Sequence, residues 1–369
     1  MSANSQPQRT DDLYCIIVSG GVGSRFWPVS REDKPKQFLD FFGTGQTLLQ
    51  RTFHRFARFI PTDQIIVVTN ESYAEETLRE LPDLNRDNLL LEPVRRNTAP
   101  AITYAALHVA ARCPGATLFV TPSDHLILDE ERFRETALKA LTFARRNNYL
   151  ITLGIVASHP ETGYGYIQWS DEMLDGFHKV KVFTEKPSKE MAELFVKSGD
   201  FLWNSGMFVW NVPTILHAVH RHLPDVYNTL NASGKAPYGT DAETAFIKEQ
   251  FGCCPGISID YGVMEKADNV LVLPSDFGWA DLGTWGSIYE FADKDQNGNA
   301  APATNAVFYD AEGNLVTLSD PNRIAIVQGV SDCIIAEHDN VLMICKKDQE
   351  QRIKTFMADS ELRFGNDYI

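Results

Sequence analysis

Short apolar runs alternate with helix-like spacing over the first part of the chain. The runs at residues 13–18, 64–69, 88–92, 116–121 and 149–156 are typical of buried strands. Between them, residues 47–60, 72–81, 98–112 and 132–147 show the apolar spacing of amphipathic helices. This alternation predicts a doubly wound sheet with parallel strands and right-handed crossovers.

The pattern changes after about residue 157. Two strands are predicted at 163–169 and 177–187 across a turn-rich segment, and an aromatic, apolar run follows at 201–211. Helices at 212–222 and 241–250 and a strand at 270–273 come next. A polar, turn-rich stretch at 293–302 then predicts a domain boundary. We therefore expect one domain over 13–292, with halves of about 13–157 and 158–292.

Five short β-like runs follow the boundary, at 306–309, 315–318, 323–327, 333–336 and 341–345. Their spacing of about eight to ten residues fits the rungs of a small β-solenoid, although the repeat is too irregular to establish one. A helix at about 348–357 would cap the stack. We expect residues 303–369 to form this second domain.

Composition narrows the class of protein. A chain of 369 residues with 44% hydrophobic content can bury one large core or two smaller ones. The net charge of −15 argues against a nucleic-acid partner. No apolar run reaches the roughly 20 residues needed to cross a bilayer, so we expect no membrane partner. The polar residues 1–12 are expected to form a disordered tail of a cytoplasmic protein.

The most informative stretch is residues 13–38. Its first strand stops at the sequence SGGVG, in which Gly20, Gly21 and Gly23 would let backbone N–H groups approach an anion closely. Arg25, Lys34 and Lys36 follow in the same loop and add three cations. The combination predicts a polyphosphate ligand.

A dinucleotide-binding fingerprint is the alternative interpretation of these glycines. That fingerprint needs a further glycine where this chain has Phe26, and it needs a helix starting directly from the loop. Pro28 and Pro35 would break such a helix. As a whole, the stretch GGVGSRFWPVS with the later KPKQF closely resembles the signature of the sugar-nucleotide pyrophosphorylases, specifically the mannose-1-phosphate guanylyltransferases.

The resemblance extends from Leu13 to about Phe356. It implies an α/β protein with a Rossmann-like doubly wound mixed sheet, of the nucleotide-diphospho-sugar transferase type, and a small C-terminal left-handed β-helix. It also implies GTP and mannose 1-phosphate as substrates, Mg²⁺ as cofactor and a homodimer. Longer family members add a phosphomannose isomerase domain, so we expect no isomerase activity. The segment AEHDNVLMIC at 336–345 departs from the acidic run usual in the family.

Several site residues have an ordinary structural explanation as well. Asn97 or Thr98 could simply cap a helix, and Asp124, after a predicted strand, could be a solvated turn residue. Glycines near a strand could mark a bulge, and Glu185-Lys186 could be a surface ion pair. The resemblance favours function, and it assigns catalytic roles to Arg25, Lys36 and Lys186; nucleotide binding to Gly20, Gly21, Gly23, Asn97, Thr98 and Asp124; sugar-phosphate binding to Gly163, Tyr164, Gly165, Glu185, Asn204 and Asp260; and metal binding to Asp124 and Asp281.

The expected reaction is in-line attack of mannose 1-phosphate on the α-phosphorus of GTP, with pyrophosphate as the leaving group. Two alternatives stay open. The enzyme could use another hexose 1-phosphate and another base, since base choice depends on hydrogen bonds that spacing does not reveal. The chain could also be a non-catalytic regulator that binds a sugar nucleotide, although Arg25, Lys36, Asp124, Lys186 and Asp281 are all present.

Overall fold

The computed structural model describes residues 12–21 and 23–369. The tail expected at 1–12 therefore lies outside the described residues, apart from Asp12. Two compact units divide the chain. Of the described residues, the first unit comprises 12–20, 52–123 and 127–279; the second comprises 21, 23–51, 124–126 and 280–369.

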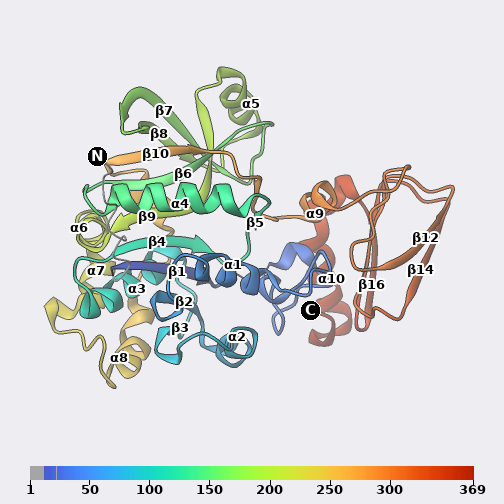
Figure 1. Ribbon diagram of the computed structural model, residues 1–369. Helices are drawn as coiled ribbons and strands as arrows, with labels where there is room; N and C mark the ends of the chain where they lie inside the picture. Colours follow the sequence, from blue (N-terminus) through green and yellow to red (C-terminus); the bar gives the residue numbers. More distant parts are fainter. Residues whose placement is uncertain (1–11, 22) are drawn as a thin grey trace, which may run out of the picture. The chain divides into compact units, whose positions relative to one another are not determined.

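A nine-stranded sheet forms the centre of the first unit (Figure 1), in the order β3-β2-β1-β4-β9-β6-β10-β8-β7. The strands are β1 Leu13–Ser19, β2 Ile65–Asn70, β3 Leu89–Glu92, β4 Thr117–Pro122, β6 Leu150–Val156, β7 Gly165–Leu174, β8 Phe177–Glu185, β9 Phe201–Asn211 and β10 Val270–Ser275. Strands β1 to β4 pair in parallel, whereas β9 runs antiparallel to both β4 and β6. The mixed sheet is thus confirmed.

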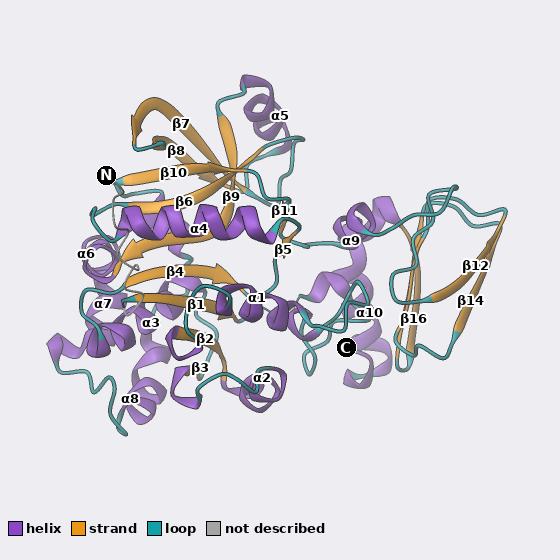
Figure 2. Ribbon diagram, in the orientation of Figure 1, coloured by secondary structure: helices purple, strands orange, loops and turns teal. Residues whose placement is uncertain are grey.

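Helices cover both faces of the sheet. Consecutive strand residues point to opposite faces, and apolar residues occur on each face. Leu118 and Val120 of β4 share a core with α3 Thr98–Arg112, α6 Val212–His222 and α7 Pro224–Asn231. Phe119, between them in sequence, instead contacts Phe56 and Phe133, from α1 Leu48–Ala57 and α4 Glu130–Ala144. The long helix α4 packs along β4, β6 and β9 (Figure 2). The smaller helices are α2 Ala74–Glu80, α5 Lys189–Ser198 and α8 Glu243–Gln250.

The sequence pattern missed part of this unit. It predicted no strand at 201–211, which forms the long antiparallel strand β9, and it missed α5 and α7. The turn expected at 170–176 is shorter, because β7 continues to Leu174 and only Asp175 and Gly176, both with positive φ, turn the chain. Alternation is hard to see in β9 because most of its residues are buried on both faces.

The second unit carries the predicted short strands: β12 Asn305–Tyr309, β13 Leu315–Leu318, β14 Ile324–Gln328, β15 Cys333–His338 and β16 Val341–Lys346. Strands two apart in the sequence pair in parallel, β12 with β14 and β13 with β15, as successive rungs do in a solenoid. The hairpin of β15 with antiparallel β16 ends that repeat. The remaining helices are α9 Trp285–Phe291 and α10 Ile353–Phe364, the latter longer than the terminal helix predicted from sequence.

One hydrophobic core joins the solenoid strands to the glycine-rich loop within the second unit. It contains Leu315, Ile334 and Met343 from the strands together with Phe26 and Trp285. The ring centroids of Phe26 and Trp285 are 5.4 Å apart, edge to face. Across both units, no helix of the described chain is long and apolar enough to span a membrane.

Candidate active site

Lys36 is the centre of a polar cluster in the second unit. Its side chain is only 7% exposed, and its Nζ lies 3.0 Å from Asp124 Oδ2. The same ammonium donates a hydrogen bond of 2.7 Å to the backbone carbonyl of Asp281. Two residues that are far from Lys36 in the sequence, and were predicted to act with it, therefore lie around its ammonium group.

Asp124 follows β4, as the sequence predicted, and its side chain is 26% exposed. Burial alone would raise the pKa of this carboxyl group, but the nearby charges of Lys36 and His125 outweigh burial and lower the pKa below its ordinary value. Asp124 is therefore an anion at neutral pH.

The loop before Lys36 has the shape that its glycines allow. Gly23 has φ +70°, and a Cβ there would lie 2.5 Å from the Cβ of Lys36. Only glycine avoids both the strained φ and the clash. Arg25 lies in the next turn, Ser24–Phe26; it is exposed and makes no side-chain hydrogen bond or ion pair with the described residues. Its guanidinium group is available to an anion.

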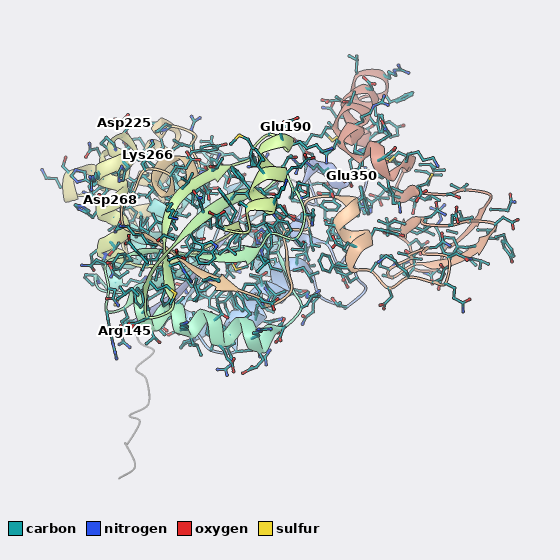
Figure 3. All side chains as sticks on the ribbon, turned by 90° about the horizontal axis from the view of Figure 1, so that it is seen from above. Arg145, Glu190, Asp225, Lys266, Asp268 and Glu350 are labelled. Atoms are coloured by element: carbon teal, nitrogen blue, oxygen red, sulfur yellow. The ribbon has the colours of Figure 1, made fainter. Side chains whose placement is uncertain are left out.

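Asp281 lies in a tightly wound segment just before α9. The Gly283 N–H donates to its Oδ1 at 2.8 Å, and Leu282 between them has φ +48° although it is not glycine. Such backbone strain persists only where the surroundings impose it. Glu350, labelled in Figure 3, accepts a 2.8 Å hydrogen bond from Gly286 N at the first turn of α9.

The oxygen donors of Asp124 and Asp281 suit a hard cation such as Mg²⁺, which usually binds one or two carboxylates and keeps several waters. No group of three or more His, Cys, Asp or Glu side chains suited to a metal ion occurs among the described residues. The carboxylates of Asp124 and Asp281 are thus two candidate oxygen ligands for a divalent ion.

A second polar group lies in the first unit, across three neighbouring strands. Gly165 of β7 is in register with Glu185 of β8 on one side and with Asn204 of β9 on the other. A Cβ at Gly165 would lie 2.3 Å from Glu185 Oε2 and 3.2 Å from Asn204 Cβ. Gly165 thus leaves the space that the Glu185 carboxylate occupies, which explains this glycine better than a bulge.

We call Gly165, Glu185 and Asn204 the Glu185 row. Asn204 connects this row to Asp260. The Asn204 side chain is buried; its Nδ2 donates to Asp260 Oδ1 at 2.8 Å, and its Oδ1 accepts from Thr152 Oγ1 at 3.1 Å. Burial, together with the nearby Glu185 charge, raises the pKa of Asp260 to about 7. Asp260 begins a short π-helical turn, a feature common at functional sites.

Lys186 adds a cation to the same group. Its Nζ lies 2.9 Å from Glu185 Oε1, and its side chain is 57% exposed. Burial opposes the charge of this ammonium, but the hydrogen bond and charge of Glu185 raise its pKa. Lys186 has φ +48° and its N–H bonds to Tyr164 O at 3.1 Å. The arrangement holds a cation beside the Glu185 carboxylate, which is 11% exposed.

Tyr164 and Gly163 lie in the loop before β7. The Tyr164 ring packs edge to face against Trp203 and Trp279, with centroids 5.3 and 5.1 Å apart. Gly163 is exposed, and its N–H donates to Glu161 Oε1 at 2.8 Å. Tyr164 is thus fixed by aromatic packing next to the Lys186 backbone, whereas the hydrogen bond of the Gly163 N–H goes to Glu161.

The start of α3 holds Asn97 and Thr98, also in the first unit. Asn97 has φ +66°, and its side chain accepts a hydrogen bond from Thr98 N. Thr98 Oγ1 accepts from Ile259 N at 2.9 Å, and Ala99 N donates to Ile257 O at 3.1 Å. The helix start is therefore tied to the segment that leads into Asp260.

Sequence reasoning missed Glu92, the last residue of β3. Glu92 is 4% exposed, its Oε1 has no hydrogen-bond partner in the described structure, and burial raises its pKa to about 7 despite the charge of Arg95. Its Oε2 lies 3.5 Å from where a Cβ of Gly20 would be. The sequence shows only an acidic residue at the end of a predicted strand; its burial and its unpaired oxygen, which call for an explanation, are seen in the structure alone.

Two family models match the chain. One, described as nucleotidyl transferase, covers residues 14–298, and the other, described as a MannoseP isomerase/GMP-like beta-helix domain, covers residues 304–358. The second match confirms the β-helix expected from sequence.

Relatives and solved structures agree with these models. Mannose-1-phosphate guanylyltransferase 2 of Escherichia coli is 35% identical, over 97% of this chain and 75% of the relative. The alginate biosynthesis protein AlgA of Pseudomonas aeruginosa is 37% identical, over 93% of this chain and 71% of the AlgA chain. A Thermus thermophilus structure described as a mannose-1-phosphate geranyltransferase superposes with a TM-score of 0.85 at 30% identity, over 95% of this chain and 99% of that one.

These matches cover nearly the whole described chain, and they place the glycine-rich loop, Asp124 and the Glu185 row in the matched nucleotidyl transferase region. The chain therefore belongs to the nucleotidyl transferase family, in the group that contains the mannose-1-phosphate guanylyltransferases.

Proposed function

We propose that the protein transfers GMP from GTP to α-D-mannose 1-phosphate, giving GDP-mannose and pyrophosphate. The observation that carries the proposal is the Lys36 cluster. One buried ammonium contacts Asp124 and Asp281, next to a glycine-rich loop whose Arg25 is exposed and unpaired among the described residues. Acids and cations arranged in this way suit phosphoryl chemistry, in which positioning and charge neutralisation do most of the work.

The glycine-rich loop would hold the leaving group. Arg25 and the amides of Gly20, Gly21 and Gly23 bind the β- and γ-phosphates, and Lys36 faces the α-phosphate. The resulting charge neutralisation lowers the repulsion between an anionic nucleophile and an anionic electrophile. Mg²⁺, held by Asp124 and Asp281, would supply further charge neutralisation to the phosphates when bound.

The Glu185 row would bind the acceptor. Lys186 holds the phosphate of mannose 1-phosphate, while Glu185, Asn204 and Asp260 face the sugar hydroxyls. Asp260, with a pKa of about 7, can donate or accept a hydrogen bond near neutral pH. Gly165 provides the room for this arrangement, and Tyr164 fixes the backbone of Lys186.

Glu92 supports the choice of guanine. The guanine Watson–Crick edge presents two adjacent N–H donors, N1–H and N2–H, and an ionised carboxylate accepts both. Uracil and thymine present only one donor there. A buried acid with an unpaired oxygen is therefore matched to guanine, since a polar group left unpaired costs affinity for the wrong base. Asn97 and Thr98, on the nearby helix start, would bind the same nucleotide.

A labelling experiment tests the transfer. Mannose 1-phosphate carrying ¹⁸O in its phosphate is incubated with GTP, Mg²⁺ and enzyme, and the products are weighed by mass spectrometry. Direct attack on the α-phosphorus leaves all the label in GDP-mannose and none in pyrophosphate. Label in pyrophosphate would refute the proposed direction of attack. Arg25→Ala and Lys186→Met are expected to lose the reaction while keeping the circular dichroism spectrum of the wild type.

We also propose a homodimer formed through the solenoid. Tyr309, Ile324 and Ile326 on β12 and β14 are more than half exposed, and they lie on paired strands. An exposed apolar patch of this kind is typical of an interaction surface. Light scattering that gives the monomer mass at micromolar concentration would refute the dimer.

A further inference from the structure

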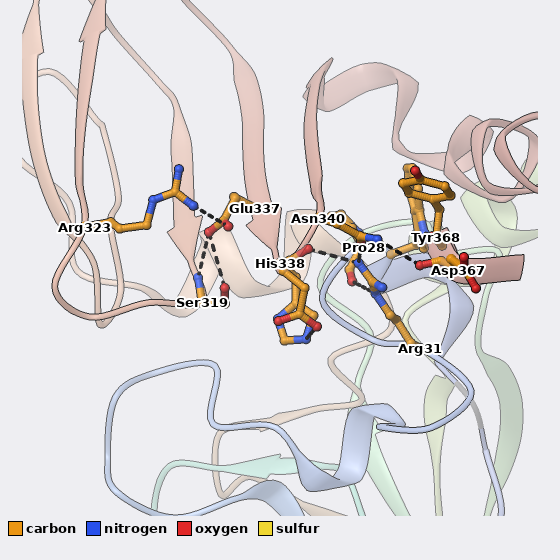
Figure 4. Close-up of polar contacts among 11 residues, drawn as sticks. Pro28, Arg31, Ser319, Arg323, Glu337, His338, Asn340, Asp367 and Tyr368 are labelled. Atoms are coloured by element: carbon orange, nitrogen blue, oxygen red, sulfur yellow. Dashed lines mark hydrogen bonds and ion pairs between the residues drawn. The ribbon is translucent and has the colours of Figure 1, made fainter. Parts of the chain in front are cut away.

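Residues 27–31, in the second half of the glycine-rich loop, are held by residues from the C-terminal part of the chain (Figure 4). Trp27 Nε1 donates a 2.7 Å hydrogen bond to the carbonyl of Tyr368. Arg31 Nη2 donates 3.0 Å hydrogen bonds to His338 O and to Asn340 Oδ1. All of these residues belong to the second unit.

Arg31 occupies the centre of these contacts. It is 8% exposed, and its Nε donates to Pro28 O at 3.2 Å within its own loop. One guanidinium group thus joins the loop backbone to the hairpin between β15 and β16. The planar fork of arginine suits such a connection, because it directs several N–H groups in fixed directions. A lysine at this position could make only some of the hydrogen bonds that the Arg31 guanidinium group makes.

The hairpin is itself tied to the segment after α10. Asn340 Nδ2 donates to Asp367 O at 3.0 Å while its Oδ1 accepts from Arg31. Asp339, which precedes it, has φ +48°, as expected in a tight two-residue turn. A continuous chain of hydrogen bonds therefore runs from the loop through Asn340 to residues 367 and 368.

The loop needs such support because it has little regular structure. Beyond the single turn Ser24–Phe26, a few local hydrogen bonds hold it, such as Val29 N to Phe26 O at 2.9 Å. Arg25 and Lys36, proposed to bind phosphates, lie on either side of Trp27–Arg31. Displacing that stretch would move both cations, and catalysis depends on positions to within about 1 Å.

We propose that Arg31 and Asn340 are positioning residues, through which the β15–β16 hairpin fixes the phosphate-binding loop for GTP. The inference rests on the proposed function, since it assigns the loop to the phosphates of GTP. Neither residue touches a reacting atom; both act through the placement of Arg25 and Lys36. The solenoid therefore supports the nucleotide-binding loop, in addition to its proposed role as the dimer surface.

A matched control is present on the same strand. Glu337, next to His338, is buried and accepts from Arg323 Nη1 at 2.6 Å and from Ser319 N at 3.2 Å (Figure 4). Neither partner has a hydrogen bond or ion pair with the described residues of the loop. Arg323→Met removes a charged contact from β15 without changing any contact of the loop. It therefore reports what loss of solenoid stability alone does to the enzyme.

The test compares Arg31→Met, Arg31→Lys, Asn340→Ala and Arg323→Met in steady-state kinetics, well below each variant's unfolding temperature. We expect Arg31→Met to lower kcat/KM for GTP about tenfold, with the KM for mannose 1-phosphate unchanged. Arg31→Lys should recover part of the loss, and Asn340→Ala should lose less than Arg31→Met. Arg323→Met should keep both KM values even if its unfolding temperature falls.

Two results would overturn the proposal: wild-type kcat/KM for GTP in Arg31→Met, or an equal loss in Arg323→Met. If Arg31→Met does not fold, Asn340→Ala decides, because Asn340 is exposed and its loss leaves the hydrophobic core intact. A wild-type enzyme inactive with GTP would instead refute the proposed function, so the two failures are distinguishable.

Discussion

Gly165→Ala tests the proposed sugar site by adding a single methyl group, without removing any polar group. The new methyl group would lie 2.3 Å from Glu185 Oε2, well inside any real carbon–oxygen contact, and 3.2 Å from Asn204 Cβ. The φ of Gly165 is not in the left-handed region, so the backbone tolerates alanine. The carboxylate of Glu185 must therefore move while the strand keeps its conformation.

The size of the effect follows from the cost of overpacking. Inserting a methyl group into a filled site costs about 1–3 kcal/mol, which corresponds to roughly 5- to 150-fold in an equilibrium constant. We expect the KM for mannose 1-phosphate to rise within this range. The KM for GTP should stay the same, because Glu185 and Asn204 are assigned to the sugar.

The assay is coupled pyrophosphate release with each substrate varied in turn. Gly115→Ala is the control, since a Cβ at Gly115 would meet no atom within 4 Å and its φ is also unstrained. In a Glu185→Ala background, Gly165→Ala should cost little more, because the displaced carboxylate is gone. Equal rises in both KM values, or full loss in the Glu185→Ala background, would refute the reasoning.

Three further predictions concern the remaining groups. Asp281→Asn should lower kcat by about 100-fold or more through loss of a charge at the phosphates, with an unchanged unfolding temperature; wild-type kcat would remove Asp281 from the site. Glu92→Gln should raise the KM for GTP about 10- to 100-fold and narrow the preference for GTP over UTP; an unchanged ratio of kcat/KM for the two nucleotides would exclude Glu92 from base selection. Because the pKa of Asp260 is raised from 3.8 to about 7, the folded state binds a proton that the unfolded state releases, so the free energy of unfolding should fall as pH rises through this window. Asp260→Asn should flatten that fall in urea titrations, and an equally steep fall in the variant would contradict the assignment.

Residues that act next to a recognisable strand or loop could be predicted from the sequence. The run Leu13–Ser19 ends in glycines and Asp124 follows the apolar strand β4, so both positions could be placed at the carboxyl ends of strands. Gly23 could be recognised as a residue of a tight loop. Its second requirement, the close approach of Lys36, could not.

Contacts between distant parts of the chain could not be predicted. Lys36 meets the backbone of Asp281 across 245 residues, and Arg31 meets Asn340 across 309. Local periodicity contains no information on such contacts, because they depend on how the solenoid and the loop share one core. Glu92 was missed for another reason: one acidic residue at a strand end looks the same whether it is solvated or buried.

Pyrophosphate release from the wild-type protein tests the central claim most directly. Purified enzyme with Mg²⁺ is given GTP, ATP, UTP, CTP or dTTP in parallel, each with mannose 1-phosphate or glucose 1-phosphate. We expect release with GTP and mannose 1-phosphate only. Release with another combination would contradict the substrate assignment while keeping the chemistry. No release from folded protein that still binds GDP-mannose in a calorimeter would contradict catalysis and favour the regulatory alternative.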